Sequence, residues 1–131
     1  KMKGFVPLLA HIERYFHDGL DYSIIDNWVD MGCVLQLNRT SILGANGKKI
    51  QSNALELLEN GYCDVICTDT HRASGNRIEQ LSDVYTVVGK RIGFDNADIL
   101  FYENPKLLLS NKEILNIEVE KKKKLFGFFG R

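Results

Sequence analysis

The fold of this chain follows from a short apolar stretch, CVLQLN at residues 33–38, which closes on a polar side chain. Two stretches of the same kind flank it, FVPLLAH at residues 5–11 and VICTD at residues 65–69. Short, nearly uninterrupted apolar runs are typical of strands that are buried on both faces of a parallel sheet. The three stretches therefore predict three parallel strands.

Helical patterns separate these predicted strands. Apolar residues recur at helical spacing between residues 24 and 31 and between residues 50 and 58, and a glycine that can stop a helix follows each segment, Gly32 and Gly61. The order of strand, helix, strand, helix, strand favours right-handed parallel connections. The predicted fold class is α/β, built from parallel βαβ units.

The rest of the chain is predicted to be helical before it ends in a basic and aromatic tail. A helical stretch ends near Gly93, and Asn104 followed by Pro105 is typical of a helix start, with the asparagine as cap. We expect a single domain over residues 1–118 and a solvated tail over residues 119–131. Contact of that tail with an anionic membrane or a partner is the alternative.

Composition is that of a globular protein of one domain. The chain has 131 residues, of which 44% are hydrophobic and 26% charged, and this balance argues against disorder and fibrous repeats. Its 17 basic and 17 acidic residues cancel, so nothing indicates a nucleic acid partner. No apolar run approaches the ~20 residues that a transmembrane helix needs. The 3 cysteines, an odd number, argue against a disulfide scaffold and favour a reducing compartment, the cytoplasm.

Polar side chains close all three predicted strands, and the carboxyl ends of parallel strands are where α/β proteins build active sites. The groups are His11-Glu13-Arg14, Asn38-Arg39-Ser41 and Asp69-His71-Arg72. We expect them to meet at one edge of the sheet.

Asp69 and His71 form a D-x-H pair. On an extended segment, residues two apart point to the same side, so a carboxylate and an imidazole can converge on one metal ion. His11, at the end of another strand, is the candidate for a third ligand. The alternative is that His71 and Asp69 only cap a loop and the next helix.

Arginines near these residues are candidates for binding phosphate. Arg14 lies three residues after His11, and a planar guanidinium can hold a phosphate or a carboxylate with two hydrogen bonds. A surface salt bridge with Glu13 or Asp18 is the alternative for Arg14. Arg72 and Arg77 are weaker candidates of the same kind, and His17 is expected at the surface.

Two further patterns resemble phosphate sites without fitting them. Cys33 and Arg39 have the C-x5-R spacing of cysteine-dependent phosphatases, but Cys33 begins an apolar run that cannot form a phosphate cradle without losing its burial. The glycine-containing segment at residues 41–48 lacks the G-x-x-x-x-G-K spacing of a phosphate loop. We expect its glycines to let the chain turn sharply.

Taken together, these segments resemble the bacterial PHP-type (polymerase and histidinol phosphatase) tyrosine-protein phosphatases of capsule and exopolysaccharide operons. The similarity runs from about residue 4 to residue 110. It is carried by PLLAHIERY at residues 7–15, LQLN at 35–38 with Ser41, Gly44, Gly47 and Lys48, and TDTHR at 68–72.

The resemblance implies a distorted, TIM-like α/β barrel with two or three metal ions, most often manganese, with iron or zinc as alternatives. It implies that the protein removes phosphate from tyrosines of the cytoplasmic kinases that control polysaccharide export. The matching positions make His11, Asp69 and His71 metal ligands. Arg14 matches a phosphate-binding arginine and Arg72 or Arg77 a second one, and we expect all three to be catalytic; we also expect Asn38 to contact the phosphate. Ile12 stands where the family's H-P-E-R motif has proline.

The chain also departs from the family pattern. The H-x-H and the further His and Glu ligands of the family's first half are not found here, and a complete barrel needs ~200–250 residues. We therefore expect this chain to be the C-terminal half of such an enzyme, inactive in isolation and prone to form a homo-oligomer. The alternatives are another PHP-type phosphoesterase, for sugar phosphates or histidinol phosphate, and an inactive half-barrel with a binding or structural role.

Overall fold

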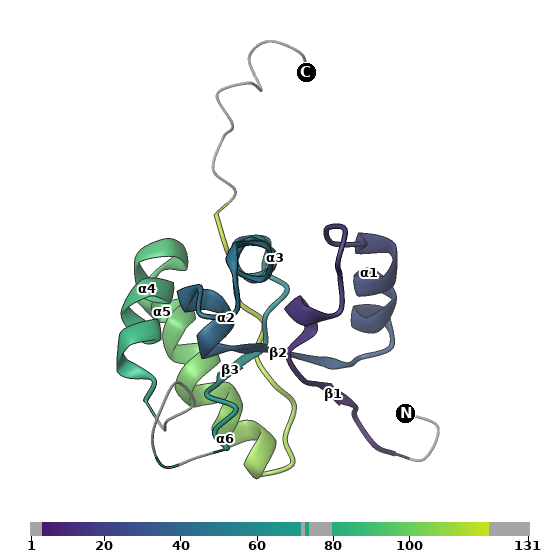
Figure 1. Cartoon of the computed structure of the whole chain (residues 1–131). Helices are drawn as coiled ribbons and strands as arrows, with labels where there is room; N and C mark the ends of the chain where they lie inside the picture. Colours follow the sequence, from purple (N-terminus) through teal and green to yellow (C-terminus); the bar gives the residue numbers. More distant parts are fainter. Residues whose placement is uncertain (1–3, 72, 74–79, 121–131) are drawn as a thin grey trace.

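Three short parallel strands form the centre of the molecule (Figure 1). The computed structural model describes residues 4–71, 73 and 80–120. Strands β1 (Leu8–Leu9), β2 (Val34–Asn38) and β3 (Val65–Cys67) lie in the order β1-β2-β3, and Leu8 pairs with Val34 while Gln36 pairs with Val65. This confirms the predicted parallel α/β class.

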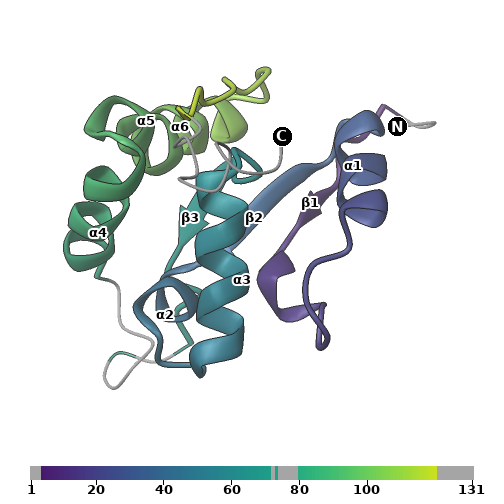
Figure 2. The ribbon, with the colours of Figure 1, turned by 90° about the horizontal axis from the view of Figure 1, so that it is seen from above.

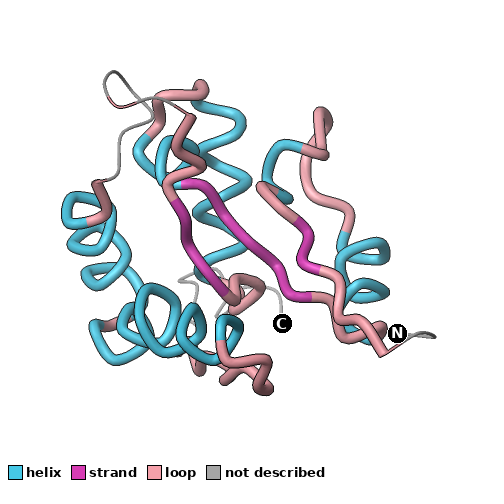
Figure 3. The backbone as a smooth tube through the Cα atoms, turned by 90° about the horizontal axis from the view of Figure 1, so that it is seen from below, coloured by secondary structure: helices cyan, strands magenta, loops and turns pink. Residues whose placement is uncertain are grey.

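Helices cover one face of the sheet and pack against its β3 edge. They are α1 (Tyr22–Asp30), α2 (Arg39–Leu43), α3 (Lys48–Glu59), α4 (Ser82–Ile92), α5 (Phe94–Asp98) and α6 (Asn104–Leu109), with a 3-10 turn η1 (Ile12–Arg14) and a π-helical turn η2 (Ile99–Glu103). Seen from above, α3 lies over the sheet with α1 on the β1 side and α4 on the other (Figure 2). Seen from below, the strands lie in front of these helices, and no helix of the described chain crosses them (Figure 3).

Strand β2 separates an apolar core from a polar face. All five of its residues are buried. Leu35 and Leu37 pack in the core with side chains of α3 such as Leu57, and burying each of them contributes about 1.5–3 kcal/mol. Because side chains alternate along a strand, Gln36 and Asn38 point to the opposite face. That face carries the polar groups described below.

Helix α6 begins at Asn104 with Pro105 in its first turn, as predicted, but Asn104 is not its cap. Helix runs without a break from Phe94 to Leu109, and a π-helical turn directly precedes Asn104. Such a turn accommodates Pro105, because proline has no N–H to donate to the regular backbone hydrogen bonds of an α-helix. The buried Asn104 side chain instead donates to the carbonyls of Asp64 (2.8 Å) and Leu115 (2.9 Å), and so ties the C-terminal segment to the start of β3.

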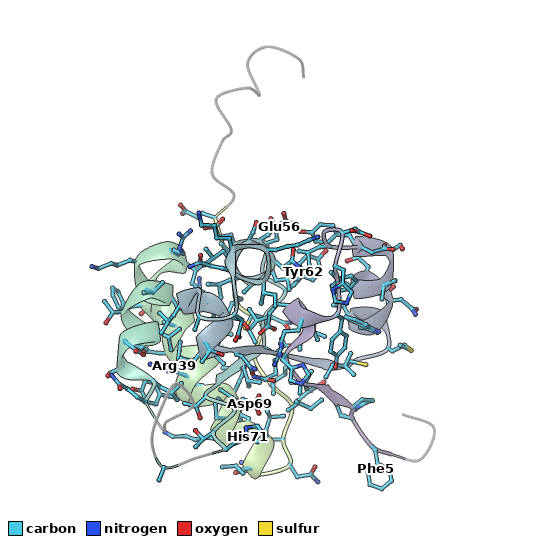
Figure 4. The ribbon with its side chains drawn as sticks, viewed as in Figure 1. Phe5, Arg39, Glu56, Tyr62, Asp69 and His71 are labelled. Carbon is cyan, nitrogen blue, oxygen red and sulfur yellow. The ribbon has the colours of Figure 1, made fainter. Side chains whose placement is uncertain are left out.

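Two tyrosines hold α1 in place. The hydroxyl of Tyr22 donates to Glu56 of α3 at 2.5 Å, and that of Tyr62 donates to Asp26 of α1 at 2.6 Å; Figure 4 labels Glu56 and Tyr62. Partial burial and the Glu56 acceptor raise the pKa of Tyr22 to about 12. Both hydroxyls therefore remain protonated donors at neutral pH.

The ends of the chain are described only in part. Of the predicted tail, residues 121–131 lie outside the described residues, and Val119 is partly buried against the core. Among the helices that the structure describes, none has the length and apolarity to cross a bilayer.

Candidate metal and phosphate site

The loop after β1 begins with a residue in the left-handed region. His11 has φ 42° and ψ 53°, and its backbone N–H donates to Oε1 of Gln36 at 2.7 Å. A left-handed residue turns the chain sharply, so the strand ends here and the 3-10 turn η1 begins. The imidazole packs edge-on against Tyr15, with ring centroids 5.8 Å apart.

Glu13 holds this loop against the sheet. Its side chain is fully buried, and Oε1 accepts the backbone N–H of Asn38 at 3.0 Å. From α3, the side chain of Asn53 donates to the carbonyls of Glu13 (3.2 Å) and Phe16 (3.1 Å). Burial raises the pKa of Glu13. The sequence places Glu13 among the polar groups at the strand ends and offers it as a salt-bridge partner for Arg14. Its role in holding the loop was missed, because nothing in the sequence indicates that its side chain points inward.

Asp69 and His71 lie together after β3. Asp69 has φ 53°, so the segment bends where an extended one was expected. The bend still brings His71 Nδ1 to 2.7 Å from the Asp69 carbonyl and 3.8 Å from its Oδ1, and Figure 4 shows the two side chains next to each other beneath the sheet. A carbonyl only accepts, so Nδ1 carries the hydrogen and the lone pair is on Nε2. That tautomer suits a metal ligand.

Strand β2 connects the two loops. Asn38 Nδ2 donates to Asp69 Oδ2 at 3.2 Å, and Gln36 Nε2 donates to Asn38 Oδ1 at 2.7 Å. Through Gln36, which accepts the His11 N–H, the ends of all three strands form one hydrogen-bonded unit. These are the strand ends at which the sequence predicts a site.

The residues present suit a divalent cation in their chemistry. Two buried side-chain atoms of the described residues, His11 Nδ1 and Glu13 Oε2, have no hydrogen-bond partner there. Imidazole and carboxylate donors are the set that manganese, iron and zinc bind. Asp69 and His71 are adjacent, but within residues 4–71, 73 and 80–120 no three His, Cys, Asp or Glu side chains come close enough to hold one ion.

The arginine candidates differ in their surroundings. Arg14 is half-buried. Neither of the salt bridges considered as its alternative, to Glu13 or to Asp18, forms among the described residues: Glu13 points inward, and Asp18 Oδ1 lies 3.8 Å from Lys49 Nζ. Arg72 and Arg77 lie outside the described residues.

The C-x5-R spacing does not form a site. Cys33 precedes β2 and Arg39 follows it, so about 20 Å of strand separates them at ~3.3 Å a residue. Arg39 donates to both carboxylate oxygens of Asp83 at 3.0 and 2.6 Å (Figure 4 labels Arg39). Those hydrogen bonds lower the pKa of Asp83 and raise that of Arg39. The prediction that this spacing is fortuitous agrees with these positions.

The fold and the strand ends define a class: parallel α/β proteins with imidazole, carboxylate and amide groups at the carboxyl edge of the sheet. Within that class, the chain belongs to the CpsB/CapC family of capsular polysaccharide synthesis, whose family model matches residues 1–110. The family resemblance expected from the sequence is confirmed.

Named relatives are tyrosine-protein phosphatases. The chain is 29% identical over 131 residues to tyrosine-protein phosphatase YwqE of Bacillus subtilis, covering 98% of this chain and 51% of that protein. It is 29% identical over 120 residues to CpsB of Streptococcus pneumoniae, covering 86% of this chain and 48% of that protein.

A solved structure of this group of proteins also matches the fold of this chain. It comes from crystal structures of YwqE and CpsB, described as unique metal-dependent tyrosine phosphatases, and superposes with a TM-score of 0.77 at 26% identity. The match covers 94% of this chain and 49% of the other. The chain thus spans about half the length of the relatives it matches.

Proposed function

We propose that this chain forms part of a metal-dependent protein-tyrosine phosphatase that acts in capsular or extracellular polysaccharide biosynthesis. The observation that carries the proposal is the Asp69–His71 pair, joined through Asn38 and Gln36 to the His11 loop at the carboxyl edge of the sheet. Membership of the CpsB/CapC family and the named phosphatase relatives support it.

In this proposal His11, Asp69 and His71 contribute ligands to a metal centre that the other half of the barrel completes, since no three such side chains of the described residues meet at one point. Manganese is the first candidate, with iron or zinc as alternatives. When bound, such a cation lowers the pKa of a coordinated water and offsets charge on phosphate oxygens. Asn38 holds the Asp69 carboxylate in place through Oδ2, and the Asp69 carbonyl holds the tautomer of His71.

The arginines act on the phosphate. Arg14 binds non-bridging oxygens with its planar guanidinium, and Arg72 and Arg77 are proposed for the same task. Asn38 was expected at the phosphate too. One hydrogen of its amide goes to Asp69 and the residue is fully buried, which favours a role in holding Asp69 over the expected contact with the phosphate. A phenolate leaving group has a conjugate-acid pKa of ~10, which reduces the need for a strong general acid.

The surrounding protein is proposed to be a TIM-like barrel in the cytoplasm, acting on phosphotyrosine of a bacterial tyrosine kinase. Strand β1 pairs with β2 alone among the described strands, and Phe5 and Val6 beside it are 74% and 57% exposed. An open edge next to exposed apolar side chains favours association, either with a further part of the barrel or with a second copy. Because the chain spans about half of its relatives' length and supplies only part of the ligand set, isolated residues 1–131 are expected to give turnover close to background.

A chimera tests the proposal. Residues 4–110 replace the matching half of YwqE, and phosphate release is measured from a phosphotyrosyl peptide, a phosphoseryl peptide and a panel of sugar phosphates with histidinol phosphate. We expect hydrolysis of the phosphotyrosyl peptide that stops with EDTA and returns with Mn²⁺. Activity that resists EDTA, or that favours the small phosphates, would overturn the proposal.

A further inference from the structure

We infer that Gln36 and Asn38 are positioning residues that hold His11 and Asp69 in a fixed relation for metal binding. This inference rests on the proposed function of the same site. Neither residue is a ligand in it; each acts through a hydrogen bond on a residue that is. We call the pair the amide relay.

Three hydrogen bonds make up the amide relay. The His11 N–H donates to Gln36 Oε1 at 2.7 Å, Gln36 Nε2 to Asn38 Oδ1 at 2.7 Å, and Asn38 Nδ2 to Asp69 Oδ2 at 3.2 Å. Gln36 is 4% exposed and Asn38 is 0% exposed. A buried amide that loses one hydrogen bond cannot replace it with a hydrogen bond to water. Loss of one of the three bonds is therefore expected to weaken the other two.

The two ends of the relay fix the orientation of both amides. A backbone N–H only donates, so the Gln36 atom facing His11 is the oxygen. An ionised carboxylate only accepts, so the Asn38 atom facing Asp69 is the nitrogen. The inner bond then has to run from Gln36 nitrogen to Asn38 oxygen, and this is the bond observed. No other arrangement of the two amides satisfies both ends.

The residues at the two ends need such support. His11 and Asp69 have positive φ, and Asn111 is the only other non-glycine residue of the described chain that does. A left-handed conformation outside glycine persists where the surroundings determine it. The Glu13 carboxylate adds a second hold, since it accepts the backbone N–H of Asn38 at 3.0 Å. Backbone N–H groups of both His11 and Asn38 thus take part in holding the relay in place.

Two substitutions at Gln36 separate the ends of the relay. Gln36→Met keeps the length of the side chain and removes its three hydrogen bonds, to the His11 N–H, to Asn38 Oδ1 and to the Leu37 carbonyl. Gln36→Glu keeps an oxygen for the His11 N–H but places a second oxygen against Asn38 Oδ1 and the Leu37 carbonyl, to both of which Nε2 now donates. Asn104→Leu is the matched control, because Asn104 is an equally buried amide that binds backbone at Asp64 and Leu115.

Two measurements on the full 131-residue chain test the relay. The first is a Mn²⁺ titration followed by NMR line broadening. The second is the exchange rate of the His11 amide hydrogen in the metal-free protein. In wild type, we expect Mn²⁺ to broaden the Asp69 and His71 resonances. Gln36→Met should raise the Mn²⁺ midpoint about 10-fold or more, as loss of a group that orients a ligand does, and should speed His11 exchange. Gln36→Glu should raise the midpoint while His11 exchange stays slow.

The outcomes separate the inference from the function beneath it. Asn104→Leu should lower the melting temperature without moving the Mn²⁺ midpoint, which distinguishes positioning from general stability. Midpoints for both Gln36 variants within twofold of wild type would overturn the relay and leave the metal site standing. A wild-type chain whose Asp69 and His71 resonances do not respond to Mn²⁺ would overturn the relay's role in this chain. The proposed function would be overturned separately, by a YwqE chimera whose hydrolysis of the phosphotyrosyl peptide resists EDTA.

Discussion

Glu13 accepts the backbone N–H of Asn38 at 3.0 Å, although the two residues are 25 positions apart and both are fully buried. This contact joins the loop that carries His11 and Arg14 to the carboxyl end of β2. A buried carboxylate would ordinarily be unfavourable, and burial does raise the pKa of Glu13. Its position is therefore explained by the backbone donor that it satisfies.

Replacing Glu13 by Ala should destabilise the chain much more than replacing it by Gln. Ala leaves the buried N–H of Asn38 without an acceptor, and an unsatisfied buried donor costs about 1–3 kcal/mol in addition to the cavity. Gln retains an oxygen for that N–H, so we expect a loss of less than about 1 kcal/mol. Urea unfolding of the two variants checks the difference, and equal losses would show that the hydrogen bond does not hold the loop.

The ion pair between Arg39 and Asp83 should contribute more than the one between Arg91 and Glu59. Arg39 uses two nitrogens, and its side chain is 12% exposed, whereas the second pair has one contact at 2.6 Å with both side chains 43% exposed. A two-point, sheltered pair is worth about 1–2 kcal/mol and an exposed one about 0–1 kcal/mol.

The comparison uses conservative changes. Arg39→Lys removes the two-point geometry and keeps the charge, and Arg91→Lys is the matched change at the exposed pair. We expect the urea midpoint to fall clearly for Arg39→Lys and to stay nearly constant for Arg91→Lys. A larger effect at Arg91 would contradict the greater contribution expected from the Arg39–Asp83 pair, which joins α2 to α4.

Asp64 gives a prediction about pH. Its side chain accepts the N–H of Leu35 at 2.8 Å, and burial raises its pKa above the usual 3.8. A raised acid pKa stabilises the fold below the unfolded pKa, and that contribution is lost as the pH rises through the folded pKa. Asp64→Asn keeps an oxygen acceptor and does not titrate.

The Asp64→Asn variant should therefore gain stability relative to wild type as the pH rises. We expect the difference in the free energy of unfolding, variant minus wild type, to be more positive at pH 7 than near pH 3.5. Urea melts of both proteins at the two pH values measure it. A difference that does not change with pH, or that changes in the opposite direction, would show that burial does not control this carboxyl.

The strands could be predicted because each is an apolar run bounded by polar residues, a pattern that depends only on neighbours in the sequence. The first strand is shorter than its run of residues 5–10. Pro7 has no N–H to donate, although its carbonyl accepts from Val34 at 2.8 Å. Regular pairing in β1 is confined to Leu8 and Leu9.

The contacts that organise the candidate site could not be predicted in the same way. Asn38 and Asp69 are 31 positions apart, and Arg39 and Asp83 are 44 apart. Sequence patterns place polar residues at the strand ends, but they do not say which amide faces which carboxylate. Asp69 was expected on an extended segment, and its left-handed backbone depends on tertiary contacts of this kind.

The last prediction distinguishes metal chemistry from thiol chemistry. In the chimera with YwqE, Asp69→Ala should reduce hydrolysis of the phosphotyrosyl peptide by about 100-fold or more, since an incomplete ligand set loses the activated water. Cys33→Ser should leave the rate within about twofold, because Cys33 and Arg39 lie at opposite ends of β2, about 20 Å apart. Cys63→Ser is not a suitable control, because that side chain is buried in the core. Steady-state rates with added Mn²⁺ and after EDTA treatment measure both effects. Activity that survives EDTA and disappears in Cys33→Ser would show that the nucleophile is the thiolate, and that the groups at the carboxyl edge of the sheet serve another purpose.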